Sequence, residues 1–168
     1  MCIGCGACVH ADPEQRLVFN ATRQMFEPSA AGTAAAAAVC PGVRVDYAGL
    51  QARRFGEAPV GPLGVIEQVL LAQSTDRERN VAASSGGVIK ELLREYLARD
   101  EVDGAIALQH VRGLDFEPRL IRDPDDVDRL PGSIYHAVRF DGALRLLSEN
   151  RGRFVLVATP CQLEGIYS

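Results

Sequence analysis

Residues 1–8 read MCIGCGAC, which places three cysteines at two successive Cys-x-x-Cys intervals, and a further cysteine stands later in the chain directly before a proline. A 4Fe–4S cluster needs four thiolates, and a tight loop with Cys at every third position supplies three of them. Glycines within the loop let the backbone turn around such a cluster without steric cost. The stretch therefore predicts one cubane cluster, whose ligands would be Cys2, Cys5, Cys8 and Cys40.

The residue at position 12 argues for one cluster rather than two. In two-cluster ferredoxins a fourth Cys follows the local run, precedes a Pro and ligates the other cluster. Here Asp12 holds that position, with Pro13 after it, while Cys40-Pro41 is placed to be the distant ligand of the first cluster.

Two alternatives compete with this interpretation. Structural zinc usually uses two separated Cys-x-x-Cys pairs, whereas this chain has three Cys in one run followed by Cys-Pro. Unrelated thiols are the second alternative. The spacing favours iron–sulfur over both.

Composition narrows the class of protein. The 168 residues fit one medium domain or two small ones, and the formal net charge of -4 argues against a nucleic-acid surface. No apolar run approaches the roughly twenty residues of a membrane span, and nothing before Cys2 resembles a signal peptide. We therefore expect a cytoplasmic protein with no membrane span. The chain stops soon after Cys161, so we also expect a fragment.

The N-terminal part has short elements. Residues 17–19 and 25–26 predict two strands around a turn at 20–23. Thr33 is a candidate N-cap for an alanine-rich helix that ends before Pro41, although an alanine-rich linker is the alternative. Residues 43–63 are rich in Gly, Pro and charge and predict a connection between modules.

The second part alternates between strand and helix patterns, which predicts an α/β module. Apolar residues recur at three- and four-residue steps over 88–97, so that helix should pack one face on a sheet. The acidic residues around Pro124 predict the first turn of a helix, with a metal site as the sharper alternative. The expected strands are 65–71, 104–108, 118–121 and 154–158, and the expected helices are 88–97 and 141–148.

Two glycine motifs are candidates for cofactor contacts. Ser84, Ser85, Gly86 and Gly87 lie directly before the predicted helix, where backbone N–H groups and hydroxyls could bind an anion such as a flavin phosphate. Simple capping by Ser is the alternative. The second motif, at residues 132–135, carries Ser133 and Tyr135, and a structural turn is its alternative reading.

A third motif follows the last predicted strand. Thr159 and Cys161 stand in the sequence TPCQ, and ligands in α/β sheets gather beyond the carboxyl ends of strands. Cys161 could be a cluster ligand, a nucleophile or a buried structural residue, since free Cys is often simply buried.

The order CIGCGAC, Cys-Pro, SSGGV, VDGAIAL, GSIY and VLVATPCQ resembles the coenzyme F-420 hydrogenase/dehydrogenase beta-subunit family over nearly the whole chain. The resemblance implies an oxidoreductase that binds FAD and iron–sulfur clusters and passes electrons between coenzyme F-420, or a similar substrate, and one-electron centres. Its partner would be a redox protein or subunit of the ferredoxin, hydrogenase or dehydrogenase type. A non-enzymatic electron carrier or docking subunit is the rival, and a zinc-stabilised interaction module is a third reading.

By comparison of matching motifs, the resemblance implies that Cys161 ligates a further cluster, whose other ligands would come from a C-terminal region. It also implies that the two glycine motifs and Thr159 line the flavin site. Ile134 and Ala158 depart from the residues usual in the family. The expected fold is α+β: a ferredoxin-like 4Fe–4S segment over 1–46, a linker over 47–63, and over 64–168 the N-terminal part of a flavin-binding α/β module with a mixed sheet, truncated at its C-terminus.

Overall fold

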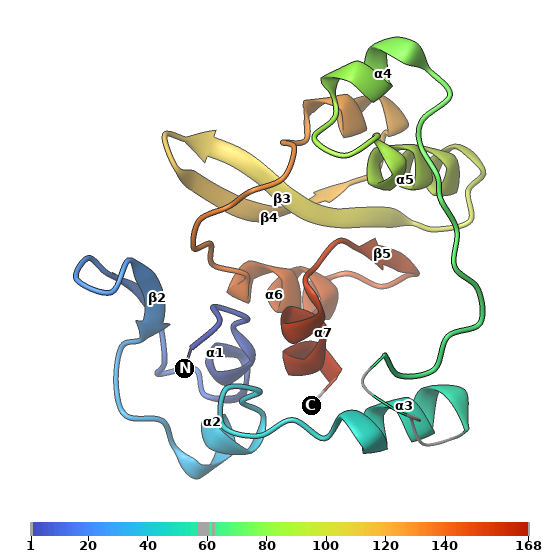
Figure 1. The fold of residues 1–168 in the computed structure, drawn as a ribbon. Helices are drawn as coiled ribbons and strands as arrows, with labels where there is room; N and C mark the ends of the chain where they lie inside the picture. Colours follow the sequence, from blue (N-terminus) through green and yellow to red (C-terminus); the bar gives the residue numbers. More distant parts are fainter. Residues whose placement is uncertain (1, 57–60, 62, 168) are drawn as a thin grey trace.

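The computed structural model describes residues 2–56, 61 and 63–167. Figure 1 shows the N-terminal residues gathered below the larger sheet, close to the C-terminal helix. This N-terminal segment contains the elements α1 (Ala7–Ala11), β1 (Leu17–Asn20), β2 (Met25–Pro28) and α2 (Ala34–Ala38). The two expected strands and the expected short helix are therefore present.

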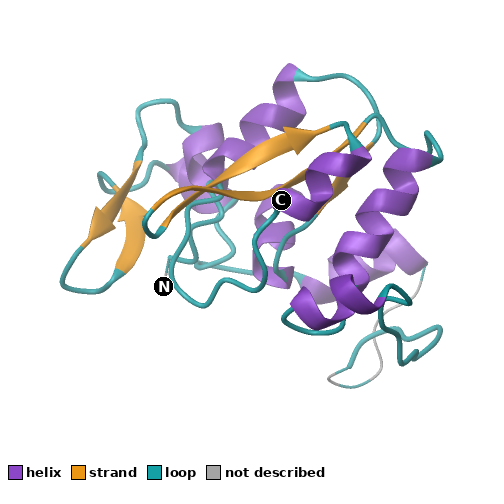
Figure 2. Cartoon of the chain, turned by 90° about the horizontal axis from the view of Figure 1, so that it is seen from above, coloured by secondary structure: helices purple, strands orange, loops and turns teal. Residues whose placement is uncertain are grey.

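The β1–β2 hairpin forms as the sequence predicts. Its strands are antiparallel, with Leu17 opposite Pro28 and Asn20 opposite Met25. The Asn20 side chain accepts hydrogen bonds from the backbone N–H groups of Thr22 and Arg23, which closes the turn. Figure 2 shows this hairpin projecting at one side, apart from the larger sheet.

Asp12 links the ends of α1 and α2. The Thr33 hydroxyl accepts from the Ala36 N–H at 3.2 Å, as an N-cap should, and donates to Asp12 Oδ2 at 3.0 Å. Asp12 also accepts from the Glu14 N–H. In this chain the residue at the fourth local position of the cysteine run therefore has a structural role.

The main sheet is mixed, with the order β4-β3-β5. Strand β3 (Gly104–Arg112) pairs antiparallel with β4 (Asp115–Ile121) and parallel with β5 (Phe154–Leu156). Helix α5 (Val88–Ala98) covers one face, and α6 (Asp141–Glu149) and α7 (Pro160–Tyr167) lie on the other (Figure 1). The expected mixed α/β arrangement is confirmed.

Side chains of β3 alternate between two apolar cores because successive residues of a strand point to opposite faces. Ala105 and Ala107 pack with Leu93 and Leu97 of α5, while Ile106 packs with Phe140 beside α6. The module is thus a sheet between two helical layers.

The two parts of the chain are in contact. The backbone N–H of Phe140, directly before α6, donates to the Gly4 carbonyl at 2.9 Å. Gly4 has a φ of +68°, and a Cβ there would lie 2.6 Å from the Val138 carbonyl oxygen. Glycine is therefore required at position 4 for the N-terminal loop to reach the module.

The middle of the chain contains one helix that was not predicted and lacks one strand that was. The predicted connection contains a helix, α3 (Tyr47–Phe55), which Asp46 caps by accepting from the Gly49 N–H. Residues 65–71, which were expected to form a strand, pair with none of the described strands. Val69 in this segment is 83% exposed. Residues 57–60 and 62 of the predicted connection lie outside the described residues.

Two short helices complete the fold. Helix α4 (Arg77–Ala82) precedes the glycine loop, and the 3₁₀ helix η1 (Pro124–Arg129) follows β4. None of the helices in the described part of the chain has the length and apolar character that a membrane crossing requires.

Candidate functional site

A cavity of about 480 Å³ lies between α5, β3 and the segment that follows β5. Its apolar wall includes Val88, Leu93, Ala107 and Val157. Of the residues predicted from sequence as cofactor contacts, the cavity brings together Ser84, Ser85, Gly87, Ser133 and Thr159. Gly86 and Tyr135 are not among its lining residues, and Tyr135 is 90% exposed.

The glycine loop before α5 needs both of its glycines. Gly86 and Gly87 have φ values of +73° and +78°, a left-handed conformation that disfavours other residues. Gly86 accepts a hydrogen bond from the Ser74 N–H at 2.6 Å, and Gly87 is the N-cap of α5. Among the described residues no side chain caps this helix, so its first-turn N–H groups are available to a ligand.

Two motifs far apart in sequence are joined at this cavity. The Ser133 N–H donates to the Ser84 hydroxyl oxygen at 3.0 Å, which ties the loop after η1 to the loop before α5. The cavity rim at Ser84 is therefore built from both predicted glycine motifs.

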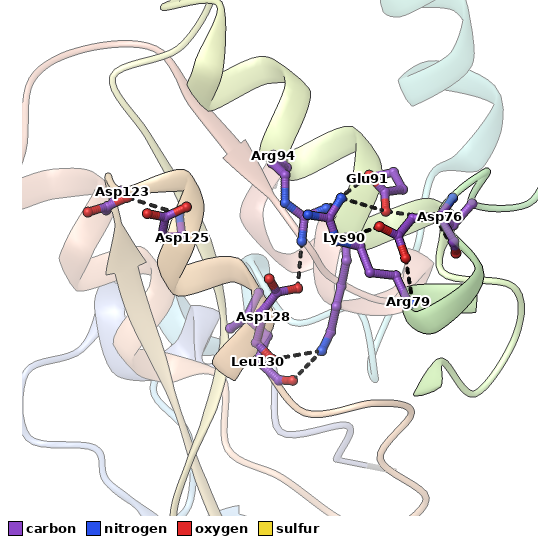
Figure 3. A network of polar contacts seen from close by, with 10 residues as sticks. Asp76, Arg79, Lys90, Glu91, Arg94, Asp123, Asp125, Asp128 and Leu130 are labelled. Carbon is purple, nitrogen blue, oxygen red and sulfur yellow. Dashed lines mark hydrogen bonds and ion pairs between the residues drawn. The ribbon is translucent and has the colours of Figure 1, made fainter. Parts of the chain in front are cut away.

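Lys90 fixes the same rim from the helix side. Its Nζ donates to the Leu130 carbonyl at 2.6 Å and to the Asp128 carbonyl at 3.3 Å (Figure 3). Arg94, one turn further along α5, pairs with Asp128 at 2.6 Å. Sequence patterns did not single out Lys90, because its role depends on residues 38 and 40 positions away.

The acidic residues around Pro124 begin a helix, as expected, with Asp125 and Asp126 in its first turn. Asp123 accepts from the Asp125 N–H at 2.9 Å at the start of η1, which is a 3₁₀ helix. Within the residues that the structure describes, no group of three or more His, Cys, Asp or Glu side chains is arranged to hold a metal ion.

Helix α7 starts at the cavity. Thr159, directly before it, lines the cavity together with Gln162, whose side chain accepts from the Thr159 N–H at 2.9 Å. The Thr159 hydroxyl lies 3.1 Å from Cys161 Sγ, but Cys161 is not among the lining residues. Gln162, the last residue of the TPCQ motif, was not predicted as a site residue, because an amide side chain by itself indicates no particular chemistry.

The N-terminal thiols are electrostatic neighbours. Burial raises the pKa of the Cys5 thiol to about 11, and the charges of Cys8, Cys40 and Cys2 raise it too. Burial also raises the pKa of Cys8, as do Cys2 and Cys40. The thiolates of Cys5 and Cys8 are therefore disfavoured without a positive partner, and the other two predicted ligands are near enough to act on them through charge.

The other side of α7 contacts this cysteine loop. Cys5 Sγ lies 2.8 Å from the position that a Cβ on Gly165 would take. Glu164, the neighbour of Gly165, is hydrogen-bonded to the Tyr47 hydroxyl and thereby raises the pKa of that phenol. Cys161 is close enough to Tyr47 to act in the same direction through its charge.

The mixed sheet, its helical layers and the cavity beside α5 define an α/β module with a candidate cofactor site. Residues 69–145 match the family model described as "Coenzyme F420 hydrogenase/dehydrogenase, beta subunit N-term". The matched region, which is less than half of the chain, is therefore similar to the family that the sequence resembles. The matched region includes both glycine motifs and none of the five cysteines.

One solved structure to which the chain is similar concerns xenon derivatization of the F420-reducing NiFe hydrogenase complex from Methanosarcina barkeri. The identity is 20% and the TM-score is 0.48. The similarity covers 56% of this chain and 34% of that chain, so this chain spans about a third of that chain's length. The comparison with curated proteins gave no match.

Proposed function

We propose that this chain is the N-terminal part of a flavin-dependent iron–sulfur oxidoreductase. FAD in the cavity beside α5 would exchange a hydride equivalent with coenzyme F-420 or a similar substrate and pass electrons singly to a 4Fe–4S cluster. A redox protein or subunit of the ferredoxin, hydrogenase or dehydrogenase type would be the electron partner. The cluster ligands would be Cys2, Cys5, Cys8 and Cys40.

The observation that carries this proposal is the position of α7. Thr159, directly before α7, and Gln162 in its first turn line the cavity, and Gly165 on the other side of the helix contacts Cys5. An eight-residue helix is about 12 Å long. The two proposed cofactor positions are thus separated by less than one short helix, which suits electron exchange between them.

The cavity residues fit a flavin. Its volume of about 480 Å³ lies in the usual range for ligand sites, roughly 300–1,000 Å³. The apolar wall suits the flat faces of an aromatic ring system, while Ser84, Ser133 and Thr159 offer hydroxyls to its polar edge. The open first turn of α5 suits a carbonyl or phosphate oxygen.

The donor set of the cysteine loop suits a cubane, which is bound by four thiolates. Each thiolate of a cubane binds a different iron atom, so its sulfurs are spaced more widely than the ligands of one ion. Among the described residues, the N-terminal thiols are near enough to interact through charge but are not grouped closely enough to bind one metal ion. This arrangement is compatible with the wider spacing of cubane ligands. Cys161, whose charge does not contribute to the raised pKa of Cys5 or Cys8, is proposed as a ligand of a further cluster.

The first test is the metal, sulfide and flavin content of the chain purified without oxygen, compared with Cys5→Ser and Cys161→Ser. We expect about four iron and four sulfide per chain and a reduced-cluster paramagnetic signal. Cys5→Ser should lose the cluster, and Cys161→Ser should retain it, because Cys161 is assigned to another site.

The outcomes separate the rival functions. Zinc without sulfide would replace the redox interpretation of the N-terminal segment by a zinc-stabilised module. A cluster with no saturable FAD binding would favour an electron carrier over a flavoenzyme. Loss of the cluster in Cys161→Ser would overturn the ligand assignment.

A further inference from the structure

A second cavity, of about 580 Å³, lies where the N-terminal segment meets β4 and α6. It borders the sheet face opposite the α5 cavity, because α6 and α5 cover different faces (Figure 1). Neither the sequence motifs nor the proposed electron path uses it. The titratable residues in its lining are His10, Arg16, Glu117, Arg139, Asp141 and Arg145.

This cavity is positively charged although the chain as a whole is acidic. Three arginines face two carboxylates in its lining, whereas the whole sequence has a formal net charge of -4. Glu117 is also paired outside the lining, with Arg119 at 3.5 Å. The local excess of positive charge is therefore larger than the lining alone suggests.

Two of the guanidinium groups are held in place by hydrogen bonds and still have unused N–H donors. Arg139 donates from Nε and Nη2 to the two carboxylate oxygens of Asp141, at 2.9 and 2.7 Å. Arg16 donates from Nη1 to the Pro13 and Gln15 carbonyls. An arginine has five N–H donors, so three remain on each group after its contacts with the described residues.

Arg145 is the third arginine of the cavity lining, and among the described residues no carboxylate is paired with it. It lies four residues after Asp141 on α6, so the two side chains share one face of the helix. Among the described residues no side chain forms an ion pair with Arg145. Its guanidinium is therefore free to bind an anion in the cavity.

The walls of this cavity are fixed relative to each other. Gly6, with a φ of +83°, packs so closely on α6 that a Cβ there would overlap the backbone of Asp141. The hydrogen bond between Phe140 and Gly4 holds the same junction. The positions of Arg16 and Arg139 thus need little reorganisation when a ligand binds, which favours affinity.

We propose that this cavity binds a small-molecule oxyanion, a ligand with a phosphate or carboxylate group gripped by Arg139, Arg145 and Arg16. Planar guanidinium groups match both kinds of oxyanion through paired N–H donors. The volume is that of a small-molecule site. This inference is independent of the proposed electron transfer, because it uses none of the cysteines and none of the residues of the α5 cavity.

Calorimetric titration of the full chain with pyrophosphate, and separately with citrate, tests the proposal. We expect saturable binding at one site per chain. Arg145→Gln should weaken it by roughly tenfold or more, because a charge-assisted hydrogen bond is lost. Glu117→Gln should strengthen it by removing an opposing charge. Arg112→Gln is the matched control, since this exposed residue of β3 makes the same change in net charge away from the cavity.

Arg139→Lys provides a second measurement that keeps the charge. It should weaken binding because an ammonium group lacks the planar fork that grips an oxyanion. Tight binding of pyrophosphate alone would assign a phosphate ligand, and tight binding of citrate alone a carboxylate ligand. The proposal is overturned if neither probe binds saturably, or if Arg112→Gln weakens binding as much as Arg145→Gln does.

Discussion

Cys5 and Gly165 are in direct contact, with the Cys5 sulfur 2.8 Å from where a Cβ on Gly165 would stand. Cys5 is 6% exposed, and the same Cβ would lie 3.2 Å from Cys5 Cβ and 3.4 Å from Ala7 Cβ. The absence of a side chain at residue 165 therefore leaves the space that the cysteine loop occupies.

This contact predicts that Gly165→Ala disturbs the proposed cluster. The added methyl group must displace Cys5, since the site is buried, and we expect the iron and sulfide content after anaerobic purification to fall clearly below that of the wild type. Gly142→Ala is the control, because a Cβ at that helical glycine makes only ordinary contacts with Pro118. An unchanged iron content and spectrum in Gly165→Ala would show that α7 does not constrain Cys5.

Phe140 should be the most costly aromatic residue to truncate. It is fully buried, with 0% exposure, and packs with Ile106 and Ala143. We expect Phe140→Ala to lower the free energy of unfolding by about 3–5 kcal/mol in denaturant titrations, through lost burial and the cavity left behind. Phe19→Ala, at a half-exposed position of the hairpin, should cost about 1 kcal/mol or less. Equal losses would contradict the assignment of Phe140 to the core.

Glu91 should give the fold a dependence on acid pH. The Ser74 hydroxyl, which donates to Glu91 at 2.8 Å, and the charges of Arg94 and Arg79 hold the pKa of this carboxyl below its ordinary value of 4.5. The lowered pKa contributes stability that is present above pH 4.5 and is lost as pH falls through the folded-state value.

The measurement is the free energy of unfolding at about pH 7 and about pH 3. Glu91→Gln should be less stable than the wild type by on the order of 1 kcal/mol at the higher pH, and the difference should shrink at the lower one. Ser74→Ala removes the main cause of the shift and should show the same convergence. A constant difference across this range would exclude the Ser74 contact as the cause.

Ser84 should matter for flavin binding through the loop it holds. Ser84→Ala leaves the Ser133 N–H without its acceptor, so the rim of the α5 cavity should loosen. We expect roughly tenfold weaker FAD binding in a fluorescence titration, the effect of one hydrogen bond of ordinary strength. Ser148→Ala, on the far side of the sheet, is the matched control. An affinity equal to that of the wild type would exclude Ser84 from the proposed flavin site.

Sequence reasoning succeeded where the signal is local. The hairpin turn at Asn20, the cap at Thr33 and the apolar stripe of α5 each depend on residues a few positions apart. Helix α3 was missed because it fully buries none of its described side chains and lies in a segment rich in Gly, Pro and charge. Residues 65–71 have the composition of a strand, but a strand also needs a partner, which composition does not supply.

Only those parts of the candidate site that leave a local signal in the sequence could be predicted. The glycine motifs are visible in sequence because left-handed backbone positions require Gly, as at Gly86 and Gly87. Lys90 and the arginines of the second cavity carry no such signal. Their roles arise from contacts between segments distant in the chain, such as the one between Lys90 and Leu130.

Four consecutive residues before and at the start of α6 serve three parts of the molecule. Val138 lines the α5 cavity, Arg139 and Asp141 line the second cavity, and Phe140 fills the core between them. Inserting or deleting one residue here would exchange these environments all at once, placing an arginine in the core or a phenylalanine in a charged cavity. The length of this segment should therefore be as strictly maintained in functional variants of the chain as the identity of its residues, and libraries that vary loop length should leave it unchanged.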